Sequence, residues 1–327
     1  MEVNNVRYQF IQANQSLMPA YFQGRWTVKT IADQQVMYST NLGAEMWFQV
    51  TDASYVRITM LELAKALPSW VAIQIDGLPY QRQTVTAAPI QLTFDGRPHI
   101  VRLVLSGNTD ADQVWTQNVG FAVQALKTDG ELRPVQLGQH SLTFIGDSIT
   151  AGCWVAGRQP AEDYRGEANY AAIASDLLDA RNVRIAYSAV GLNKSGTGGV
   201  PPLPDSLTAI DFETPWEPMP TDLVLINVGS NDRIESADSF TILLRNFLNQ
   251  VQTLYPNSRL AVMIPFNQCF DRVVRLVVAE FMQIDLIETA DWQPSTTDYT
   301  HPDLAGSQVA GTQLAQALRN KYPEIFE

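Results

Sequence analysis

The chain has few of the residues that mark disulfide scaffolds, metal sites and membrane segments. Its 327 residues include two cysteines, Cys153 and Cys269, which are too few for a disulfide framework and lack the spacing of metal ligands. No apolar run approaches the ~20 residues of a membrane helix. The first ten residues, MEVNNVRYQF, lack both the charged and the apolar region of a signal peptide. We therefore expect no metal or other cofactor, no membrane partner and a cytoplasmic protein.

Positive charge is also scarce. The 22 Lys and Arg residues stand against 34 Asp and Glu residues, which gives a formal net charge of −12 at pH 7. A surface of this sign repels nucleic acids and anionic membranes, and no basic cluster offsets it. We therefore expect no nucleic-acid partner, and the composition leaves the oligomeric state unknown.

The first part of the chain, up to about residue 137, has the pattern of β-structure. Short alternating or β-branched runs separated by turn residues occupy 45–51, 54–61, 70–76 and 99–107. The Asp-Gly pair at 95–96 lies between two such runs and predicts a hairpin, and only 61–67 shows a short helical pattern. The regular spacing predicts an all-β, jelly-roll-like sandwich domain over residues 1–137.

After about residue 140, strand-like and helix-like segments alternate. Strand-like apolar runs occupy 141–146, 183–191, 221–229, 258–266 and 284–289, and helical patterns occupy 167–180, 236–255, 271–283 and 305–322. Nearly continuous apolar strands indicate a parallel sheet that is covered on both faces. The pattern predicts a three-layer α/β domain over residues 138–327, with the boundary in the polar stretch 127–140.

Small and polar residues gather where the strands of this predicted sheet end, which is where α/β sheets bind ligands. The segments are Gly146-Asp147-Ser148, Val190-Gly191-Leu192-Asn193, Gly229-Ser230-Asn231-Asp232 and, before the last helix, Asp298-Tyr299-Thr300-His301. They contain the parts of an acyl-transfer site, namely a serine nucleophile, a histidine base and an acid that holds the histidine. Of the three histidines, His99 and His140 fall in the sandwich and the boundary, so His301 is the candidate base.

Each of these residues also has a simpler interpretation. Gly, Asp and Ser are common in turns and N-caps, so Ser148 also suits the start of a helix. His301, followed by a proline, also suits the cap of the last helix. For acyl transfer, the backbone N–H groups of Ser148 and Gly191 and the side-chain amide of Asn231 are the predicted donors of an oxyanion hole. Asp147 is expected to brace its loop through backbone hydrogen bonds.

In combination, the four segments resemble the sequence blocks of the SGNH, or GDSL-type, hydrolases. GDSIT (146–150), AVG (189–191), GSND (229–232) and DYTHPD (298–303) occur in the order of those blocks, and the resemblance spans residues 141–327. It implies that Ser148 is the nucleophile, His301 the base and Asp298 the acid, with Ser148, Gly191 and Asn231 forming the oxyanion hole. A β-sandwich in front of such a domain is similar to the acetylesterases of carbohydrate esterase family 2.

We therefore predict a serine esterase that removes O-acyl groups, most readily acetyl, from a carbohydrate through an acyl-enzyme. The alternatives are a lipase or thioesterase of the same fold and, from another class, a non-catalytic carbohydrate-binding protein. Asp291 and Asp303 compete with Asp298 for the role of the acid. Trp154 and Trp292, together with Trp216, are candidate sugar contacts that also suit the core. Cys153 is expected to be a small buried residue in the first helix rather than a second nucleophile.

Overall fold

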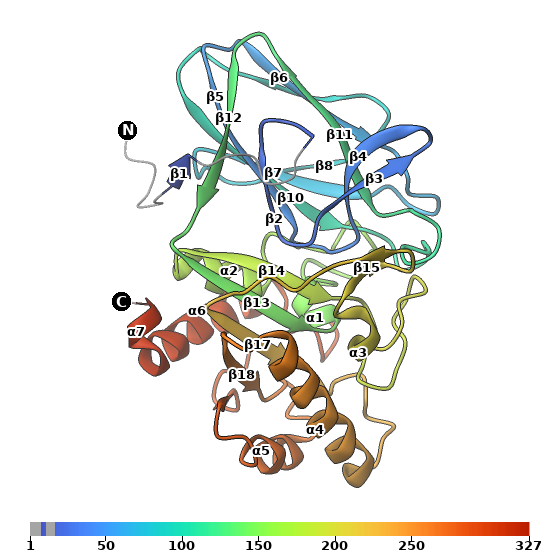
Figure 1. Ribbon diagram of the computed structural model, residues 1–327, viewed down its shortest axis with the longest axis vertical. Coiled ribbons are helices and arrows are strands. Elements are labelled where there is room, and N and C mark those ends of the chain that lie inside the picture. Colours follow the sequence, from blue (N-terminus) through green and yellow to red (C-terminus); the bar gives the residue numbers. More distant parts are fainter. Residues whose placement is uncertain (1–7, 11–16, 327) are drawn as a thin grey trace.

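The computed structural model describes residues 8–10 and 17–326. An antiparallel β-sandwich is stacked on an α/β part whose uppermost strands, β14 and β13, face it (Figure 1). The change from antiparallel to parallel pairing falls between Leu137, the last residue of β12, and His140, the first residue of β13. The predicted fold class is confirmed. Within the described ranges, no helix is long and apolar enough to cross a membrane.

Two antiparallel sheets form the sandwich. The first has the order β1-β12-β5-β10-β7-β8, with β2 also paired to β5, and comprises β1 (Tyr8–Phe10), β2 (Tyr21–Gln23), β5 (Glu45–Thr51), β7 (Trp70–Ile75), β8 (Gln81–Thr84), β10 (His99–Gly107) and β12 (Glu131–Leu137). The second has the order β3-β4-β11-β6-β9 and comprises β3 (Thr27–Ile31), β4 (Gln34–Ser39), β6 (Tyr55–Leu61), β9 (Ile90–Thr93) and β11 (Phe121–Thr128). Alternate residues of β5 and β6, such as Phe48 and Ile58, are buried in the cluster shared by the two sheets.

Two local predictions for the sandwich are wrong. The Asp-Gly pair at 95–96 does not close a hairpin, because β9 pairs with β6 whereas β10 pairs with β5 and β7, so the turn crosses between sheets. Its Gly96 instead exchanges backbone hydrogen bonds with the turn at 52–53. Residues 62–67 are not helical, because the buried carboxylate of Asp112 accepts the backbone N–H groups of Lys65 and Ala66 at 3.1 Å and so fixes a non-helical turn.

The parallel sheet has the order β14-β13-β17-β18-β19, with β13 and β17 at its centre. Its strands are β13 (His140–Gly146), β14 (Ala180–Ala186), β17 (Leu223–Asn227), β18 (Arg259–Met263) and β19 (Ile284–Ile287), and a small ribbon is formed by β15 (Ala209–Asp211) and β16 (Thr214–Pro215). In chain order this is the 2-1-3-4-5 arrangement, whose ligand crevice lies where neighbouring crossovers leave in opposite directions, between β13 and β17.

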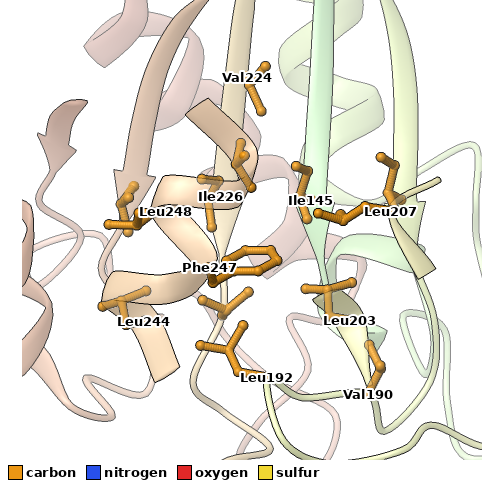
Figure 2. Packing of buried hydrophobic residues seen from close by; sticks show 14 of the residues in the cluster. Ile145, Val190, Leu192, Leu203, Leu207, Val224, Ile226, Leu244, Phe247 and Leu248 are labelled. Atoms are coloured by element: carbon orange, nitrogen blue, oxygen red, sulfur yellow. The ribbon is translucent and has the colours of Figure 1, made fainter. Parts of the chain in front are cut away.

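Helices cover both faces of this sheet. They are α1 (Ser148–Ala151), α2 (Tyr170–Leu177), α3 (Leu203–Ser206), α4 (Ala237–Leu254), α5 (Asp271–Val278), α6 (Leu304–Lys321) and α7 (Pro323–Phe326). On one face, Phe144 and Leu225 pack in a cluster with residues of α2 and α6. On the other, Ile145 and Ile226 pack with Leu244, Phe247 and Leu248 of α4 (Figure 2), in a cluster that also includes residues of α5. The alternation of buried side chains along each strand therefore produces the three layers that the sequence pattern predicts.

The sandwich and the α/β part share their cores. Val114, Trp115 and Val119, from the segment between β10 and β11, lie in the α4 and α5 cluster, whereas Cys153 and Tyr164 of the α/β part lie in the sandwich cluster. In addition, Arg25 is fully buried and donates hydrogen bonds to the backbone carbonyl of Ser206 at 3.0 Å and to the hydroxyl of Tyr187 at 3.3 Å. The two parts are therefore interlocked rather than tethered by a linker.

Candidate active site

The segments that carry the candidate residues meet at the carboxyl edge of the parallel sheet. Ser148 begins α1 directly after β13, the Gly191 segment follows β14, and Asn231 follows β17. Because these three strands are neighbours in the sheet, their ends lie side by side. The loop before α6 supplies His301 to the same place, where it hydrogen-bonds to Ser148.

Ser148, His301 and Asp298 form one hydrogen-bonded chain. The Oγ of Ser148 lies 2.7 Å from Nε2 of His301. The Nδ1 of His301 lies 2.8 Å from Oδ2 of Asp298 and 3.0 Å from Oδ1. With the carboxylate accepting from Nδ1–H, Nε2 faces the serine as an acceptor, which is the arrangement that a general base requires. The structure therefore brings together all three residues of the predicted triad.

Asp298 is held in its ionised form by its own loop. Its Oδ1 accepts the backbone N–H groups of His301 at 2.9 Å and Thr300 at 3.1 Å. Burial raises the pKa of the Asp298 carboxyl, but these backbone bonds and the neighbouring ring outweigh burial and lower its pKa below the ordinary value. An ionised Asp298 beside Nδ1 orients the His301 ring and favours its protonated form.

Ser148 is the first residue of α1 and not its cap. The N-cap is Asp147, whose Oδ1 accepts the N–H of Ile149 at 3.0 Å. At the first helical position, the N–H of Ser148 has no acceptor within the helix and is available to a ligand. Burial, followed by the nearby charge of Asp232, raises the pKa of Asp147 to about 7. Asp147 is thus a brace for the turn that carries Ser148.

Three contacts hold the loop that carries His301. The N–H of Thr297 donates to the carbonyl of His301 at 2.9 Å, and Thr296 forms a β-bridge with Pro302. Arg158, which belongs to the long connection between α1 and α2, donates to the carbonyl of Thr297 at 3.0 Å. Cross-loop pairing and this external arginine together limit the freedom of the histidine.

The oxyanion-hole candidates differ in what the structure shows. The Nδ2 of Asn231 donates to the carbonyl of Val190 at 3.0 Å, which orients the amide and leaves its second N–H without a partner among the described residues. The N–H of Gly191, by contrast, donates to the carbonyl of Lys194 at 2.9 Å. Its predicted role as an oxyanion donor therefore requires that this bond open or be shared, and the role stays a prediction.

The competing acids and the thiol are occupied elsewhere. Asp303 is the N-cap of α6 and accepts the N–H of Gly306 at 2.7 Å. Asp303, and not His301, therefore caps the last helix, and it is Asp298 that contacts the ring of His301. Asp291 is exposed. Cys153 is buried as expected, although α1 ends at Ala151, before it. Burial raises the pKa of the Cys153 thiol well above its ordinary value, which opposes a nucleophilic role.

The candidate sugar-binding tryptophans all pack against hydrophobic clusters. Trp154 packs edge-to-face on Tyr164 with ring centroids 4.8 Å apart, and the ring centroids of Trp292 and Phe266 are 6.2 Å apart. Trp216 lies beneath the guanidinium of Arg25 at 4.8 Å. All three side chains are partly buried. Contact of Trp154 and Trp292 with substrate stays a prediction, and packing accounts for part of each ring.

Sequence reasoning missed three residues beside the site. Tyr299, between the acid and the base, is 93% exposed and has a left-handed backbone with φ of 68°. Arg158 gives no motif signal, because its partner is a backbone carbonyl 139 residues away. Asp232, the last letter of the GSND block, is 1% exposed and binds the Gly191 turn. Only Asp232 had a signal in the sequence, namely its place in the block.

In residues 8–10 and 17–326, no group of three or more His, Cys, Asp or Glu side chains is arranged to hold a metal ion. The carboxylate of Asp298 is paired with the His301 ring and with backbone N–H groups.

Solved structures with the same two-part fold include several carbohydrate esterases. A family two carbohydrate esterase from Clostridium thermocellum, in complex with cellohexaose, matches with a TM-score of 0.77 and 19% identity over 93% of this chain and 99% of that one. An acetyl xylan esterase from the rumen bacterium Butyrivibrio proteoclasticus matches with a TM-score of 0.78 and 19% identity over 98% and 100% of the respective chains. A family two carbohydrate esterase from Cellvibrio japonicus has a TM-score of 0.75 and 15% identity over 96% and 98%. At these identities the likeness concerns the fold.

The sequence itself carries the family assignment. A search of curated protein sequences finds no significant match. The model of the GDSL-like lipase/acylhydrolase family, however, matches residues 144–309, which is half of the chain and includes Ser148, Asn231 and His301. The chain therefore belongs to the GDSL-like lipase/acylhydrolase family, and it is a carboxylic ester hydrolase.

Proposed function

We propose that the protein is a serine esterase that removes O-acetyl groups from a carbohydrate, with Ser148 as nucleophile, His301 as general base and acid, and Asp298 as the acid that orients it. One observation carries this proposal. A serine Oγ lies 2.7 Å from an imidazole Nε2 whose other nitrogen lies 2.8 Å from a carboxylate. These distances are within the range that proton transfer requires.

The first half-reaction follows from this geometry. Nε2 of His301 takes the proton of Ser148 as Oγ attacks the ester carbonyl, and the carbonyl oxygen becomes an oxyanion. The N–H of Ser148, at the start of α1, and the free N–H of Asn231 are the donors available to that oxygen. The imidazolium then gives its proton to the sugar oxygen as the ester bond breaks, which leaves an acyl-enzyme on Ser148.

Water completes the cycle. His301 takes a proton from water, the hydroxide attacks the acyl-enzyme carbonyl, and acetate leaves as Ser148 recovers its proton. Asp298 stays ionised throughout, because its Oδ1 accepts two backbone N–H groups besides the His301 ring bonds. No redox or group-transfer cofactor takes part in this sequence of steps.

Two observations support a short acyl group. The turn after Gly191 folds back on itself, with Gly196 donating to the carbonyl of Val200 at 2.9 Å. Its apolar side chains, Leu192 and Val200, are buried in a hydrophobic cluster and add no exposed apolar surface. A carbohydrate as the acyl carrier is supported by the fold shared with carbohydrate esterases, including one described as an acetyl xylan esterase.

The chain-length profile of the enzyme tests this substrate class. We expect kcat/KM for 4-nitrophenyl esters to be highest for acetyl and to fall steeply by about eight carbons, because a closed pocket excludes what it cannot hold. In a lipase, each methylene that enters an acyl groove gains about 0.8 kcal/mol, so kcat/KM rises with chain length. Acetate release from an acetylated xylooligosaccharide is measured alongside. A maximum at eight carbons or more contradicts the proposal and favours the lipase alternative.

A further inference from the structure

The turn that follows β14, residues 190–194, is wrapped around a buried carboxylate. The Oδ1 of Asp232 accepts the backbone N–H of Leu192 at 2.8 Å and that of Asn193 at 3.3 Å. The N–H of Gly191 closes the turn by donating to the carbonyl of Lys194 at 2.9 Å. The consecutive N–H groups at 191, 192 and 193 are therefore all directed inward, to Lys194 and to Asp232.

The glycine at position 191 leaves room for that carboxylate. A Cβ at this position would lie 2.5 Å from Oδ1 and 3.0 Å from Oδ2 of Asp232, which is closer than a methyl group can approach. The absence of a side chain at Gly191 therefore has a reason inside the protein, namely the space that Asp232 occupies. The neighbours on both sides, Val190 and Leu192, are anchored in the hydrophobic cluster (Figure 2).

Asn231 and Asp232 bind the same turn, one as a hydrogen-bond donor and the other as an acceptor. The amide of Asn231 donates to the carbonyl of Val190 at 3.0 Å, while the carboxylate of Asp232 accepts the N–H groups two and three residues later. The orientation of the Asn231 amide therefore depends on where the Val190 carbonyl lies. That carbonyl is in turn fixed by the turn that Asp232 holds.

The burial of Asp232 reduces the stability of the fold. Its side chain is 1% exposed, and its Oδ2 has no hydrogen-bond partner among the residues that the structure describes. Burial raises the pKa of its carboxyl, and the backbone N–H groups of Asn193 and Leu192 oppose this only in part. An unpartnered buried carboxylate oxygen reduces stability, so function is a reason to retain it.

We propose that Asp232 is a positioning residue of the oxyanion hole: it fixes the turn at 190–194, and through the carbonyl of Val190 it sets the direction of the Asn231 amide. This inference rests on the proposed esterase function and deepens it. Oxyanion donors act only when they are preorganised near the developing charge, and small misplacements reduce kcat strongly.

The direct test compares Asp232→Ala and Asp232→Asn with a matched control. Asp129 in the sandwich accepts the N–H groups of two successive residues, Ser54 at 2.9 Å and Tyr55 at 3.3 Å, so Asp129→Ala removes equivalent bonds away from the site. We expect Asp232→Ala to lower kcat about 10-fold to 100-fold with little change in KM, by analogy with loss of a preorganised donor. Asp232→Asn keeps one acceptor oxygen and should recover most of kcat, and Asp129→Ala should keep wild-type kcat.

A double-mutant cycle with Asn231→Ala separates positioning from general structural damage. If Asp232 acts through Asn231, the Asn231→Ala/Asp232→Ala enzyme loses little more kcat than Asn231→Ala alone, whereas independent effects multiply. If Asp232→Ala does not fold, Gly191→Ala takes its place in the cycle, because its methyl group displaces the same carboxylate. We then expect the same non-multiplicative loss.

The results that overturn the inference are distinct from those that overturn the proposed function. Wild-type kcat in folded Asp232→Ala, an effect confined to KM, or losses that multiply with Asn231→Ala would each refute the positioning role. These outcomes are read against an active wild type and an inactive Ser148→Ala enzyme. A wild type that hydrolyses no acetyl ester, or a Ser148→Ala enzyme as active as wild type, refutes the proposed function instead.

Discussion

At the scale of single residues, the position of one carboxylate decides how His301 is oriented. Asp298 lies within 3.0 Å of the ring Nδ1 through both oxygens and also accepts the backbone N–H of the same histidine. Asp298 therefore holds both the imidazole ring and the backbone of His301. Without the carboxylate, Nδ1 is free to act as the acceptor, and Nε2 then presents a proton to Ser148 instead of a lone pair.

We therefore expect Asp298→Asn to lower kcat by about 10³ or more, with a folded protein and a similar KM. The measurement is kcat for acetate release at neutral pH, together with the melting temperature. Asp303→Asn is the control, because Asp303 caps α6 and asparagine is also a good N-cap residue. An Asp298→Asn enzyme within threefold of wild type would show that the acid is not needed, and that Ser148 and His301 act as a dyad.

Asp147 gives a pH-dependent prediction for stability. Its pKa is raised to about 7 by burial and then by Asp232, so the folded state keeps this carboxyl neutral where the unfolded chain has ionised it. The stability that the neutral form contributes is present below about pH 4 and is lost as pH rises to about 7. Asparagine at this position stays neutral and keeps the acceptor for the N–H of Ile149.

The expected result is that the melting temperature of Asp147→Asn, relative to wild type, is higher at about pH 8 than at about pH 5. Asp129→Asn is the control: the Ser54 hydroxyl lowers the pKa of the Asp129 carboxyl, so its contribution is fully present above about pH 4 and its melting-temperature difference from wild type should be the same at about pH 5 and about pH 8. A melting-temperature difference for Asp147→Asn that does not change with pH would contradict a raised pKa.

At the scale of elements, the loop of residues 296–302 is a functional unit that its neighbours hold in place. The bond from Arg158 to the carbonyl of Thr297 links this loop to the connection between α1 and α2. That connection is held in turn by Arg82 of β8, which donates to the carbonyls of Glu162 and Tyr164 at 2.9 Å. The connection between α1 and α2 therefore contacts both the sandwich and the loop that carries His301.

Arg158→Ala should reduce kcat/KM by up to about 10-fold, because a net hydrogen bond contributes about 1 kcal/mol and 1.4 kcal/mol is one factor of ten in rate. Arg133→Ala is the matched control, since Arg133 is an exposed sandwich residue paired with Glu131 at 3.2 Å. Equal kcat/KM in the two variants would mean that Arg158 does not help to position the His301 loop.

The elements themselves could be predicted where burial imposes a regular period. The strand β17 and the helix α4 fall within the predicted segments 221–229 and 236–255. Both were predictable, because β17 is buried on both faces and α4 has a stripe of buried residues at helical spacing. Segment 61–67 was not predictable, since its conformation depends on Asp112, about 50 residues away in sequence. Likewise, spacing alone did not distinguish Asp298 from Asp303 as the partner of His301. The distinction depends on where α6 begins, because that makes Asp303 the N-cap of the helix.

At the scale of the whole molecule, the division of the sequence into a sandwich and an α/β part coexists with shared cores. Trp115 of the sandwich part packs edge-to-face on Tyr187 with ring centroids 5.8 Å apart. The backbone N–H of Trp115 donates to the carbonyl of Gly198 at 3.0 Å. Asp110 accepts the hydroxyl of Ser188 at 3.2 Å, just before the Gly191 turn. Sequence periodicity cannot show such interlocking, because it does not reveal which apolar residues contact another part of the chain.

Residues 138–327 expressed alone should therefore be poorly soluble or have a lower kcat/KM than the full chain. The fragment lacks Val114, Trp115 and Val119 from its main cluster and leaves Ala186 and Cys153 without their covering residues. Solubility, the melting temperature and kcat/KM of the fragment measure this. A soluble fragment with full activity would show that the sandwich is dispensable.

The central claim is that ester hydrolysis depends on Ser148 in the hydrogen-bonded chain with His301 and Asp298. Its most direct test is the kcat/KM of Ser148→Ala for 4-nitrophenyl acetate, measured beside the wild type, with melting temperatures to confirm that both are folded. The account predicts a loss of about 10³-fold or more, because removal of a nucleophile leaves only binding and the oxyanion donors. A folded Ser148→Ala enzyme that keeps more than a tenth of the wild-type rate would contradict it.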